Sequence, residues 1–187
     1  MVKKNTCVFI SGKGTNLKNL INRSRDNTFP INIKLIITNN KNAQGILNAK
    51  INSIPYMVIN SRIRNHENKI LAVLKKNRIS FICLAGYMKI ISKNFIREFG
   101  KKIINIHPSL LPKFKGLNTF ERILRNKEIK TGCTVHYVNE HLDGGHIIAK
   151  KSFQIHSLDN EEVLKQKTQQ LEYKVFPEAI IKIFRNN

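Results

Sequence analysis

The sequence predicts an α/β protein built on a mainly parallel, doubly wound sheet flanked by helices. Short apolar runs typical of strands alternate with segments of helical periodicity from the N-terminus onwards. Glycine-rich or polar turns follow several of these runs, which is where ligands bind in sheets of this class. Near the C-terminus two strand-like runs follow one another, which indicates an antiparallel strand–loop–strand unit at one edge of the sheet.

The expected strands and helices alternate along the first part of the chain. Apolar residues are contiguous in the strand-like runs, whereas they recur at three- and four-residue spacing in the helical segments. The strands are expected at 6–10, 31–37, 56–59, 79–85 and 103–106. The helices are expected around 17–21, at 43–50, at 67–76 and in a short segment that ends at 95–99.

The pattern changes in the last part of the chain. Runs at 133–138 and 147–153 are expected to be strands, joined by an Asp-Gly-Gly loop. Asp159 with Glu162 resembles a capping box, which places the start of the last helix there. Pro177 is expected to kink or split that helix, because proline lacks the backbone donor that an inner helical turn requires.

Size and composition favour one ordinary globular domain. The chain has 187 residues, of which 41% are hydrophobic, so it can bury a core of useful size. It contains no apolar run near the roughly 18–20 residues that span a bilayer, and its start lacks a secretory signal, so a cytoplasmic protein is expected. Three cysteines match no zinc or disulfide pattern and are expected to be free thiols: Cys7, Cys83 and Cys133.

The chain is strongly basic, with 33 Lys and Arg against 12 Asp and Glu and a formal net charge of +21. One interpretation is a nucleic-acid partner, since such a field attracts polyanions. The other is the codon bias of an A+T-rich genome, because Lys, Asn and Ile are abundant. The basic residues are scattered and do not interleave with aromatics, which favours the second interpretation. Part of the charge would still draw in anionic substrates.

A glycine-rich turn follows the first expected strand and opens a helix. Its residues are Ser11, Gly12, Lys13, Gly14, Thr15 and Asn16. Glycines let the backbone approach a ligand closely, and the helix N-terminus adds partial positive charge, so a phosphate suits this place. The turn matches neither the dinucleotide fingerprint nor the P-loop. Phosphate binding and a plain tight turn both remain open from this segment alone.

A polar pair follows the strand expected at 103–106. Asn105 and His107 are two residues apart, so their side chains share one face of the strand, and Pro108 ends it. An amide and an imidazole aimed at one point suit a developing oxyanion and a proton transfer. The alternative is a polar turn with a structural histidine.

A third segment, with Asp143 in the Asp-Gly-Gly loop, could complete this group. The Asp-Gly dipeptide, here at Asp143, usually forms only a turn. If the loop reaches the strand end that carries His107, the Asp143 carboxylate would orient the imidazole and raise its pKa.

Together these segments resemble the folate-dependent phosphoribosylglycinamide formyltransferases over nearly the whole chain. The strongest mark is the run Asn-Ile-His-Pro-Ser-Leu-Leu-Pro at 105–112, which is specific for folate formyltransferases as a group. The Ser-Gly-x-Gly-Thr-Asn turn at 11–16 separates this family from its relatives. Further marks are Leu84 to Ile90, Gly132 to His136 and Leu142 to Gly145.

The resemblance implies a role for each matched residue. The catalytic residues would be Asn105, His107 and Asp143. The ribonucleotide would contact Gly14, Thr15, Asn16 and Glu172. The folate would contact Arg64, Tyr87, Met88, Lys89, Ile90 and Asn105, with Arg62 as an alternative to Arg64. His136 would orient the loop or only fill space.

The resemblance also implies the reaction, with the formyltransferase fold over residues 1–187 as a single domain. The N-terminal half would bind the phosphate and ribonucleotide, and the C-terminal half the folate and the catalytic groups. The formyl group of 10-formyltetrahydrofolate, a co-substrate, would pass directly to the amine of 5′-phosphoribosylglycinamide in de novo purine biosynthesis. No metal, membrane or specific nucleic acid is expected, and the protein would be a monomer or weak homodimer.

The chain departs from the family pattern in one loop, and two other functions also fit parts of the sequence. Asn118 and Phe120 stand where many members carry histidines, and Lys115 where proline is common. Methionyl-tRNA formyltransferases share the 105–112 run, but chains of that family are longer and carry a second domain after the shared one. A non-catalytic basic nucleic-acid-binding protein is the alternative from another class, and it predicts affinity that falls steeply with salt.

Overall fold

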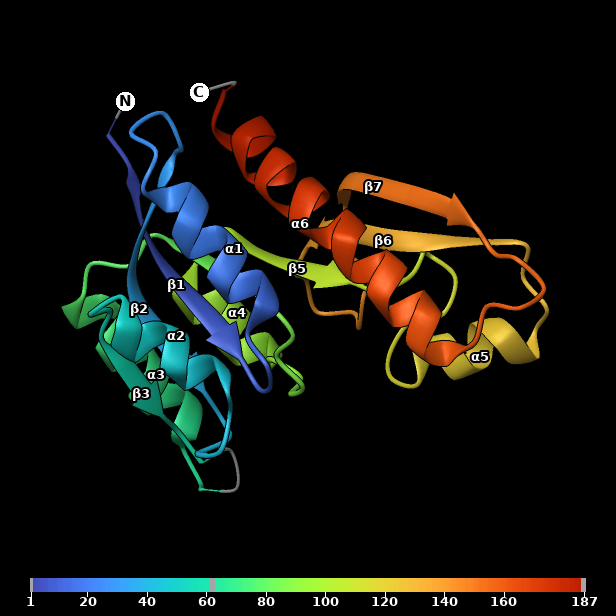
Figure 1. The fold of residues 1–187 in the computed structure, drawn as a ribbon. Helices are drawn as coiled ribbons and strands as arrows, with labels where there is room; N and C mark the ends of the chain where they lie inside the picture. Colours follow the sequence, from blue (N-terminus) through green and yellow to red (C-terminus); the bar gives the residue numbers. More distant parts are fainter. Residues whose placement is uncertain (1, 61–62, 186–187) are drawn as a thin grey trace. The chain divides into compact units, whose positions relative to one another are not determined.

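The computed structural model describes residues 2–60 and 63–185. Contacts divide the chain into two compact units, Met1–Ile104 (unit 1) and Asn105–Asn187 (unit 2). The boundary falls inside one strand (Figure 1).

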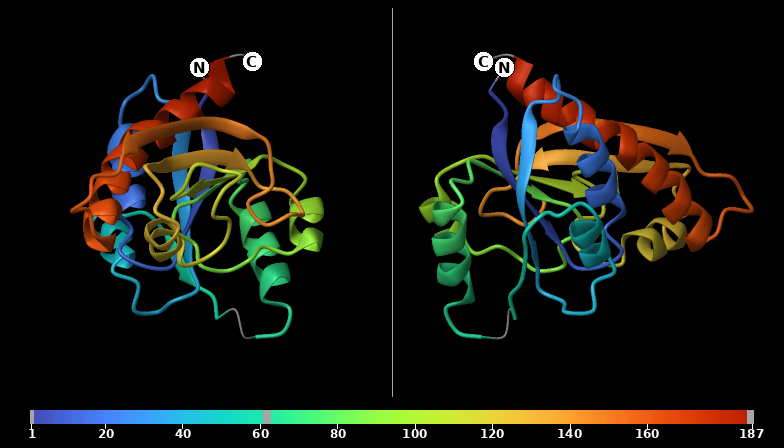
Figure 2. Two further views of the ribbon diagram at one scale, coloured as in Figure 1. Left: turned by 90° about the vertical axis from the view of Figure 1, so that its right-hand side faces the viewer. Right: turned by 60° about the vertical axis from the view of Figure 1, so that its left-hand side comes forward.

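Unit 1 is a run of strand–helix repeats. Its strands are β1 (Lys4–Ile10), β2 (Ile31–Thr38), β3 (Tyr56–Val58) and β4 (Phe81–Leu84), followed by the start of β5 (Ile103–His107). Its helices are α1 (Thr15–Ser24), α2 (Gly45–Ile51), α3 (His66–Lys76) and α4 (Lys93–Phe99). Strands β2 and β4 pair with β1, and β3 pairs with β2, all in parallel. Figure 2 shows α1 and α2 on one side of these strands and α3 and α4 on the other.

Unit 2 continues from β5 into an antiparallel pair. Its further elements are α5 (Thr119–Arg125), β6 (Lys130–Tyr137), β7 (Ile147–Gln154) and α6 (Glu161–Arg185). Strands β6 and β7 pair in antiparallel register from Lys130 opposite Gln154 to His136 opposite Ile147. Through the shared strand β5 the strand order is β3-β2-β1-β4-β5-β6-β7. The predicted fold class, with its antiparallel C-terminal edge, is confirmed.

The apolar patterns of the sequence became the core. In unit 1, β1 and β4 are buried over most of their length, and Phe9, Phe81 and Phe95 are among the largest fully buried side chains. In unit 2, the inner face of α6 buries Phe176 and Ile180. Each such apolar side chain contributes about 1.5–3 kcal/mol when fully removed from water. The three cysteines are free and buried, as predicted.

Two expectations about the last part of the chain need correction, and one helix was not predicted. Helix α6 begins after Asn160, whose Oδ1 accepts the N–H of Val163 at 3.0 Å, so Asn160 and not Asp159 caps it. Asp159 instead accepts from Lys167 at 2.6 Å. Helix α6 is not split at Pro177, because the residues on both sides of it are held by buried packing. Helix α5 was not predicted, since its seven residues lack a clear amphipathic repeat.

Gly132 allows the close approach of β6 and β7. A Cβ atom at this position would lie 1.9 Å from the Lys151 carbonyl oxygen and 2.7 Å from the Ser152 Cα, so backbone would have to move. We expect Gly132→Ala to lower the free energy of unfolding by about 1–3 kcal/mol, the usual cost of overpacking. Thermal or urea unfolding measures this, with Gly12→Ala as the control, because nothing lies within 4 Å of a Cβ there. Equal stability of both variants would contradict the packing seen here.

Candidate active site

The side chains of Asn105, His107 and Asp143 meet in unit 2. Asn105 and His107 lie on β5, and Asp143 lies in the loop between β6 and β7. The His107 Nδ1 is 3.3 Å from the Asp143 Oδ2, and the Asn105 Nδ2 donates to the Asp143 Oδ1 at 3.4 Å. The loop therefore does reach the strand that carries the polar pair. Three residues from two distant segments of the sequence form one polar cluster.

Burial and backbone contacts hold Asp143 in place. Only 8% of its side chain is exposed, and its Oδ2 accepts the backbone N–H of Gly116 at 2.9 Å. Its φ of 45° lies in the left-handed region, which Asp tolerates better than most residues. The Asp-Gly-Gly sequence thus supplies a residue that can both turn the chain and present a carboxylate inward.

His136 belongs to the same cluster. Its ring, on β6, is 2% exposed, and its Nδ1 lies 2.8 Å from the Tyr137 carbonyl oxygen, so Nδ1 carries a proton. Its Nε2 lies 3.2 Å from the Asn105 Nδ2 and 3.5 Å from the Asp143 Oδ1. The Asn105 amide nitrogen thus contacts both the His136 Nε2 and the Asp143 Oδ1, which fixes the orientation of that amide. The ring does more than fill space.

The backbone of Phe114 completes the surroundings of His107. The carbonyl oxygen of Phe114 lies 2.8 Å from the His107 Nε2, so this nitrogen donates to it. Phe114 has a φ of 57°, and the nearby Gly116 has a φ of 80°. Sequence reasoning missed this partner, because every residue has a carbonyl and only the path of the loop decides which one is near.

The pKa of His107 is shifted in the direction opposite to the expectation. Burial lowers the pKa of His107 below its usual 6.5, although the Asp143 carboxylate and the Phe114 carbonyl act to raise it. Burial also acts to raise the pKa of Asp143, but the neighbouring His136, the Gly116 N–H and His107 outweigh it and hold that pKa below its usual range. At neutral pH the pair is thus a neutral imidazole beside a carboxylate.

These protonation states leave room for one more proton in the cluster. A neutral His107 has one N–H, and the shorter contact, to the Phe114 carbonyl at 2.8 Å, assigns it to Nε2. The bare Nδ1 then faces the Asp143 Oδ2 at 3.3 Å with no hydrogen between them. A proton arriving at Nδ1 would join the two groups, so this pair can accept a proton and give it back.

The shift of His107 can be measured directly. We expect an NMR titration of its imidazole to give a pKa below 6.5, because burial disfavours the charged ring. In Asp143→Asn the carboxylate that raises this pKa is gone, so the midpoint should move still lower. A higher His107 pKa in Asp143→Asn would contradict the arrangement described here.

The glycine-rich turn lies in unit 1 between β1 and α1. Gly14 is the N-cap of α1 with a φ of 70°, and a Cβ there would lie 2.6 Å from the Gly45 Cα. The position therefore requires glycine both for its conformation and for its close approach to α2. Thr15 is half-buried and the Asn16 side chain is buried at the first turn of α1.

The segment that follows β4 is hydrogen-bonded to the start of this turn. The Ser11 hydroxyl accepts the Met88 N–H at 2.8 Å, and the Ser11 N–H donates to the Gly86 carbonyl at 3.1 Å. Tyr87 packs edge-on against Phe9 with ring centroids 5.2 Å apart. Burial and the charge of Glu67 raise the pKa of Tyr87 to about 12, so its hydroxyl stays protonated.

The other predicted contact residues are spread over exposed loops and one helix. Met88, Lys89 and Ile90 are exposed after β4, with Met88 at 63% and Ile90 at 76%. Large apolar side chains at such exposure suit a surface that a flat apolar ligand covers. Arg64 is exposed before α3, whereas Arg62 lies outside the described residues.

Glu172 is half-buried on α6, toward β6. Burial and the charge of Glu172 together raise the pKa of the Cys133 thiol to about 12, which places this carboxylate near β6. Its predicted contact with a sugar remains a prediction.

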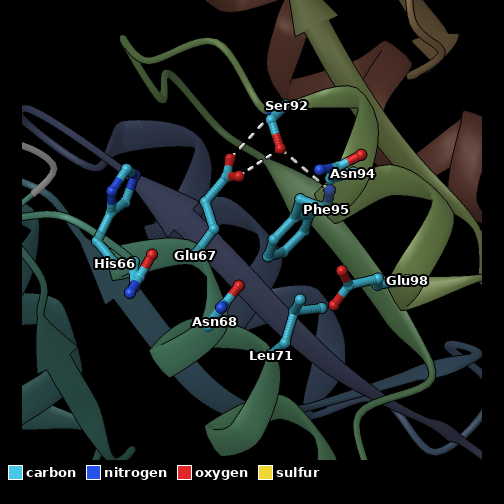
Figure 3. A pocket seen from close by; sticks show the side chains of 9 residues that line it. His66, Glu67, Asn68, Leu71, Ser92, Asn94, Phe95 and Glu98 are labelled. Carbon is cyan, nitrogen blue, oxygen red and sulfur yellow. Dashed lines mark hydrogen bonds between the residues drawn. The ribbon is translucent and has the colours of Figure 1, made fainter.

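A polar pocket of about 340 Å³ lies in unit 1 between the starts of α3 and α4 (Figure 3). Glu67 reaches across it to accept the N–H and the hydroxyl of Ser92, the N-cap of α4. Glu98 also lines it, but none of the predicted site residues does. The pocket is thus a feature of helix capping, separate from the predicted site.

The described part of the chain offers neither a metal-binding cluster nor a membrane-spanning helix. Among residues 2–60 and 63–185 no three His, Cys, Asp or Glu side chains are grouped so as to hold a metal ion. Within the same ranges no helix combines the length and the apolar character needed to cross a membrane.

Comparisons with known proteins converge on one family. The family model described as "Formyl transferase" matches residues 4–180. The chain is 38% identical to the phosphoribosylglycinamide formyltransferase of Haemophilus influenzae, over 97% of this chain and 87% of that protein. It is 41% identical to the trifunctional purine biosynthetic protein adenosine-3 of Drosophila pseudoobscura pseudoobscura, over 95% of this chain, but it spans only 14% of that protein.

A solved structure extends the likeness to the fold. The phosphoribosylglycinamide formyltransferase from Bacillus halodurans superposes with a TM-score of 0.92 at 33% identity, covering 96% of this chain and 95% of that one.

Proposed function

The chain belongs to the formyl transferase family, and from that membership we propose that it transfers the formyl group of 10-formyltetrahydrofolate to the amine of 5′-phosphoribosylglycinamide. The cluster of amide, imidazole and carboxylate in unit 2 is the observation that carries the chemistry of this proposal. The relatives named phosphoribosylglycinamide formyltransferase support the choice of substrate. The product would be the N-formyl ribonucleotide of purine biosynthesis.

In the proposed reaction the substrate amine attacks the formyl carbon. A nitrogen–carbon bond forms, and negative charge develops on the formyl oxygen. Asn105 Nδ2 and His107 Nε2 are the N–H donors that stabilise this oxyanion, with the oxygen taking the place of the Asp143 Oδ1 beside Asn105 and of the Phe114 carbonyl beside His107. One such donor contributes about 10²–10³-fold in rate. A neutral imidazole serves well here, since it donates one hydrogen bond without the cost of burying a charge.

The proton of the attacking amine must then reach the leaving folate nitrogen. The bare His107 Nδ1 and the Asp143 Oδ2, 3.3 Å apart, form a place where that proton can rest. Collapse of the intermediate breaks the bond between the formyl carbon and the folate nitrogen, which takes the proton. Atoms and charge balance without a covalent enzyme intermediate, and His136 keeps the Asn105 amide oriented throughout.

The glycine-rich turn of unit 1 is the proposed phosphate site of the ribonucleotide. Gly14, Thr15 and Asn16 begin α1, where backbone N–H groups and the helix dipole favour an anion. Glu172 is the proposed contact to the sugar. The exposed apolar segment at Met88–Ile90, with Tyr87 and Arg64, is the proposed folate surface, and Asn105 would contact folate as well as catalyse. The cationic surroundings suit the carboxylates of a folate tail.

The test is turnover with both substrates. The purified protein, 10-formyltetrahydrofolate and 5′-phosphoribosylglycinamide are mixed, and loss of the formyl-folate is followed by absorbance. We expect saturable turnover that is poor with the same substrate lacking its phosphate. Formylation of methionyl-tRNA, with no turnover of the ribonucleotide, would instead assign the enzyme to a different acceptor and overturn the proposal.

A further inference from the structure

The charge of the protein is divided unequally between its two units. Residues 1–104 contain 20 Lys and Arg against only 3 Asp and Glu, whereas residues 105–187 contain 13 against 9. Genome-wide codon bias acts on the whole chain, and the density of basic residues is indeed similar in both units. The difference is the near absence of carboxylates from unit 1, which such a bias does not explain.

Half of the basic residues of unit 1 lie where its strands begin and its helices end. In parallel strand–helix repeats the chain returns along each helix to the amino edge of the sheet, so these segments meet there. We define the amino-edge face by its ten basic residues: Lys3, Lys4, Arg23, Arg25, Lys50, Lys75, Lys76, Arg78, Lys101 and Lys102. All are exposed except Lys3, which is partly buried.

Hydrogen bonds confirm that segments of this face adjoin. The Lys3 Nζ donates to the Ser24 carbonyl at 2.7 Å, which links the start of β1 to the end of α1. The Arg25 guanidinium donates to the Asn52 Oδ1 at 2.7 Å, which links the end of α1 to that of α2.

Further bonds extend the face to the other side of β1. The Asn5 Nδ2 donates to the Arg78 carbonyl at 3.4 Å, and the Lys101 Nζ donates to the Ile79 carbonyl at 3.4 Å. The five segments therefore form one continuous surface within unit 1. Strands are about 4.8 Å apart, so the surface extends on the order of 20 Å, the length of several phosphates.

The composition of this face fits a phosphodiester backbone. The exposed aromatic side chain at this edge is Tyr56, the first residue of β3, and Asn27 is an exposed amide that can donate to phosphate oxygens. Two carboxylates lie in these segments: Asp26, which accepts from the N–H and hydroxyl of Thr28, and Glu98 in the last turn of α4. These segments also expose the apolar side chains of Val2, Ile51 and Tyr56, but the ten cations outnumber them, which favours a polyanion over a protein partner that needs an apolar centre.

We propose that the amino-edge face of unit 1 binds the phosphate backbone of nucleic acid, without sequence preference. This edge is opposite to the strand ends that carry the glycine-rich turn and the segment after β4, so binding is separate from the proposed catalysis. Basic residues at helix ends also stabilise helix dipoles, but that role explains neither the cations at the starts of β1 and β5 nor the missing carboxylates.

The test compares two matched fourfold variants of the full chain. The face variant changes Lys4, Lys50, Lys75 and Lys76 to Gln. The control variant changes four exposed lysines of unit 1 near the opposite strand ends to Gln, namely Lys18, Lys41, Lys69 and Lys93. Both lose four charges, and thermal unfolding checks that both remain folded. Fluorescence anisotropy measures binding to a labelled single-stranded RNA and a DNA duplex across a salt series.

We expect the wild type to bind both nucleic acids with a Kd in the range of about 10⁻⁴–10⁻⁶ M, and this Kd should rise as salt is added. The face variant should bind single strands roughly tenfold or more weakly, with a salt slope smaller by about 0.7 for each lost contact, while the control variant changes much less. The face variant should keep formyl-transfer turnover.

Three results would overturn the proposal. Equal losses in both variants would mean a diffuse field with no defined face. If the wild type shows no binding in this range of Kd, nucleic acid is not a ligand of the amino-edge face. Equally tight binding to polyglutamate or to anionic vesicles at the same salt would assign the face to polyanions in general.

Discussion

Replacing His107 with alanine is expected to lower kcat by about 10²–10⁴-fold, the contribution of a well-placed acid–base group. The variant loses both the Nε2 donor proposed for the oxyanion and the Nδ1 that faces Asp143. Binding of the ribonucleotide phosphate should change little, because the glycine-rich turn belongs to the other unit. Steady-state kinetics and isothermal calorimetry with the ribonucleotide separate the two effects.

His156→Ala is the matched control for His107→Ala. His156 is exposed in unit 2 and outside the cluster, so its loss should leave kcat within a factor of two or so. Because His107 is buried, thermal unfolding must confirm that the His107 variant is folded. A folded His107→Ala enzyme with turnover near the wild type would remove this residue from the mechanism.

Replacing Asp143 with asparagine is expected to lower turnover by about 10²–10⁴-fold while affecting ribonucleotide binding far less. Asparagine has the same shape and tolerates the left-handed φ of 45°, so the loop should keep its path. Its amide, however, cannot hold the proton that the carboxylate and His107 share in the proposed transfer. The ratio of the loss in kcat to the loss in affinity is the quantity to measure.

Glu161→Gln provides the charge-matched control for this experiment. It removes one carboxylate from the exposed start of α6, so the net charge of both variants is equal. An Asp143→Asn protein that loses binding and turnover in equal proportion would indicate a damaged loop and would count against the proton role. Rescue of turnover at higher pH in that variant would also count against it, since no carboxylate remains to ionise.

The sequence was informative about the elements because local patterns have local causes. Contiguous apolar runs became the buried strands β1 and β4, and the three- and four-residue spacing in α1 placed Leu17, Leu20 and Ile21 in the core. The prediction failed where short-range signals competed. Asp159 and Asn160 are both good capping residues, and the pairing of Asp159 with Lys167 left Asn160 as the cap.

The net charge of the sequence does not show where the charged residues lie on the folded protein. Because the basic residues are scattered, the net charge of +21 was attributed mainly to codon bias, with part of it expected to draw in anionic substrates. Only the division into units and the return of helices to one edge of the sheet showed that half of the basic residues of unit 1 lie at that edge, where only Asp26 and Glu98 carry negative charge.

The sequence by itself determined which groups could do the chemistry. The spacing of Asn105 and His107 on one strand and the Asp-Gly-Gly loop required only local geometry, and their motifs indicated the family. Tertiary structure decided the direction in which the pKa of His107 is shifted, because burial lowers this pKa although the Asp143 carboxylate acts to raise it. It also decided the partners, because the Phe114 carbonyl and the His136 ring reach the cluster only through the folded path of the chain. A sequence does not show which side chains are buried or which backbone carbonyls they contact. The groups that hold protons in this site could therefore be assigned only from the structure.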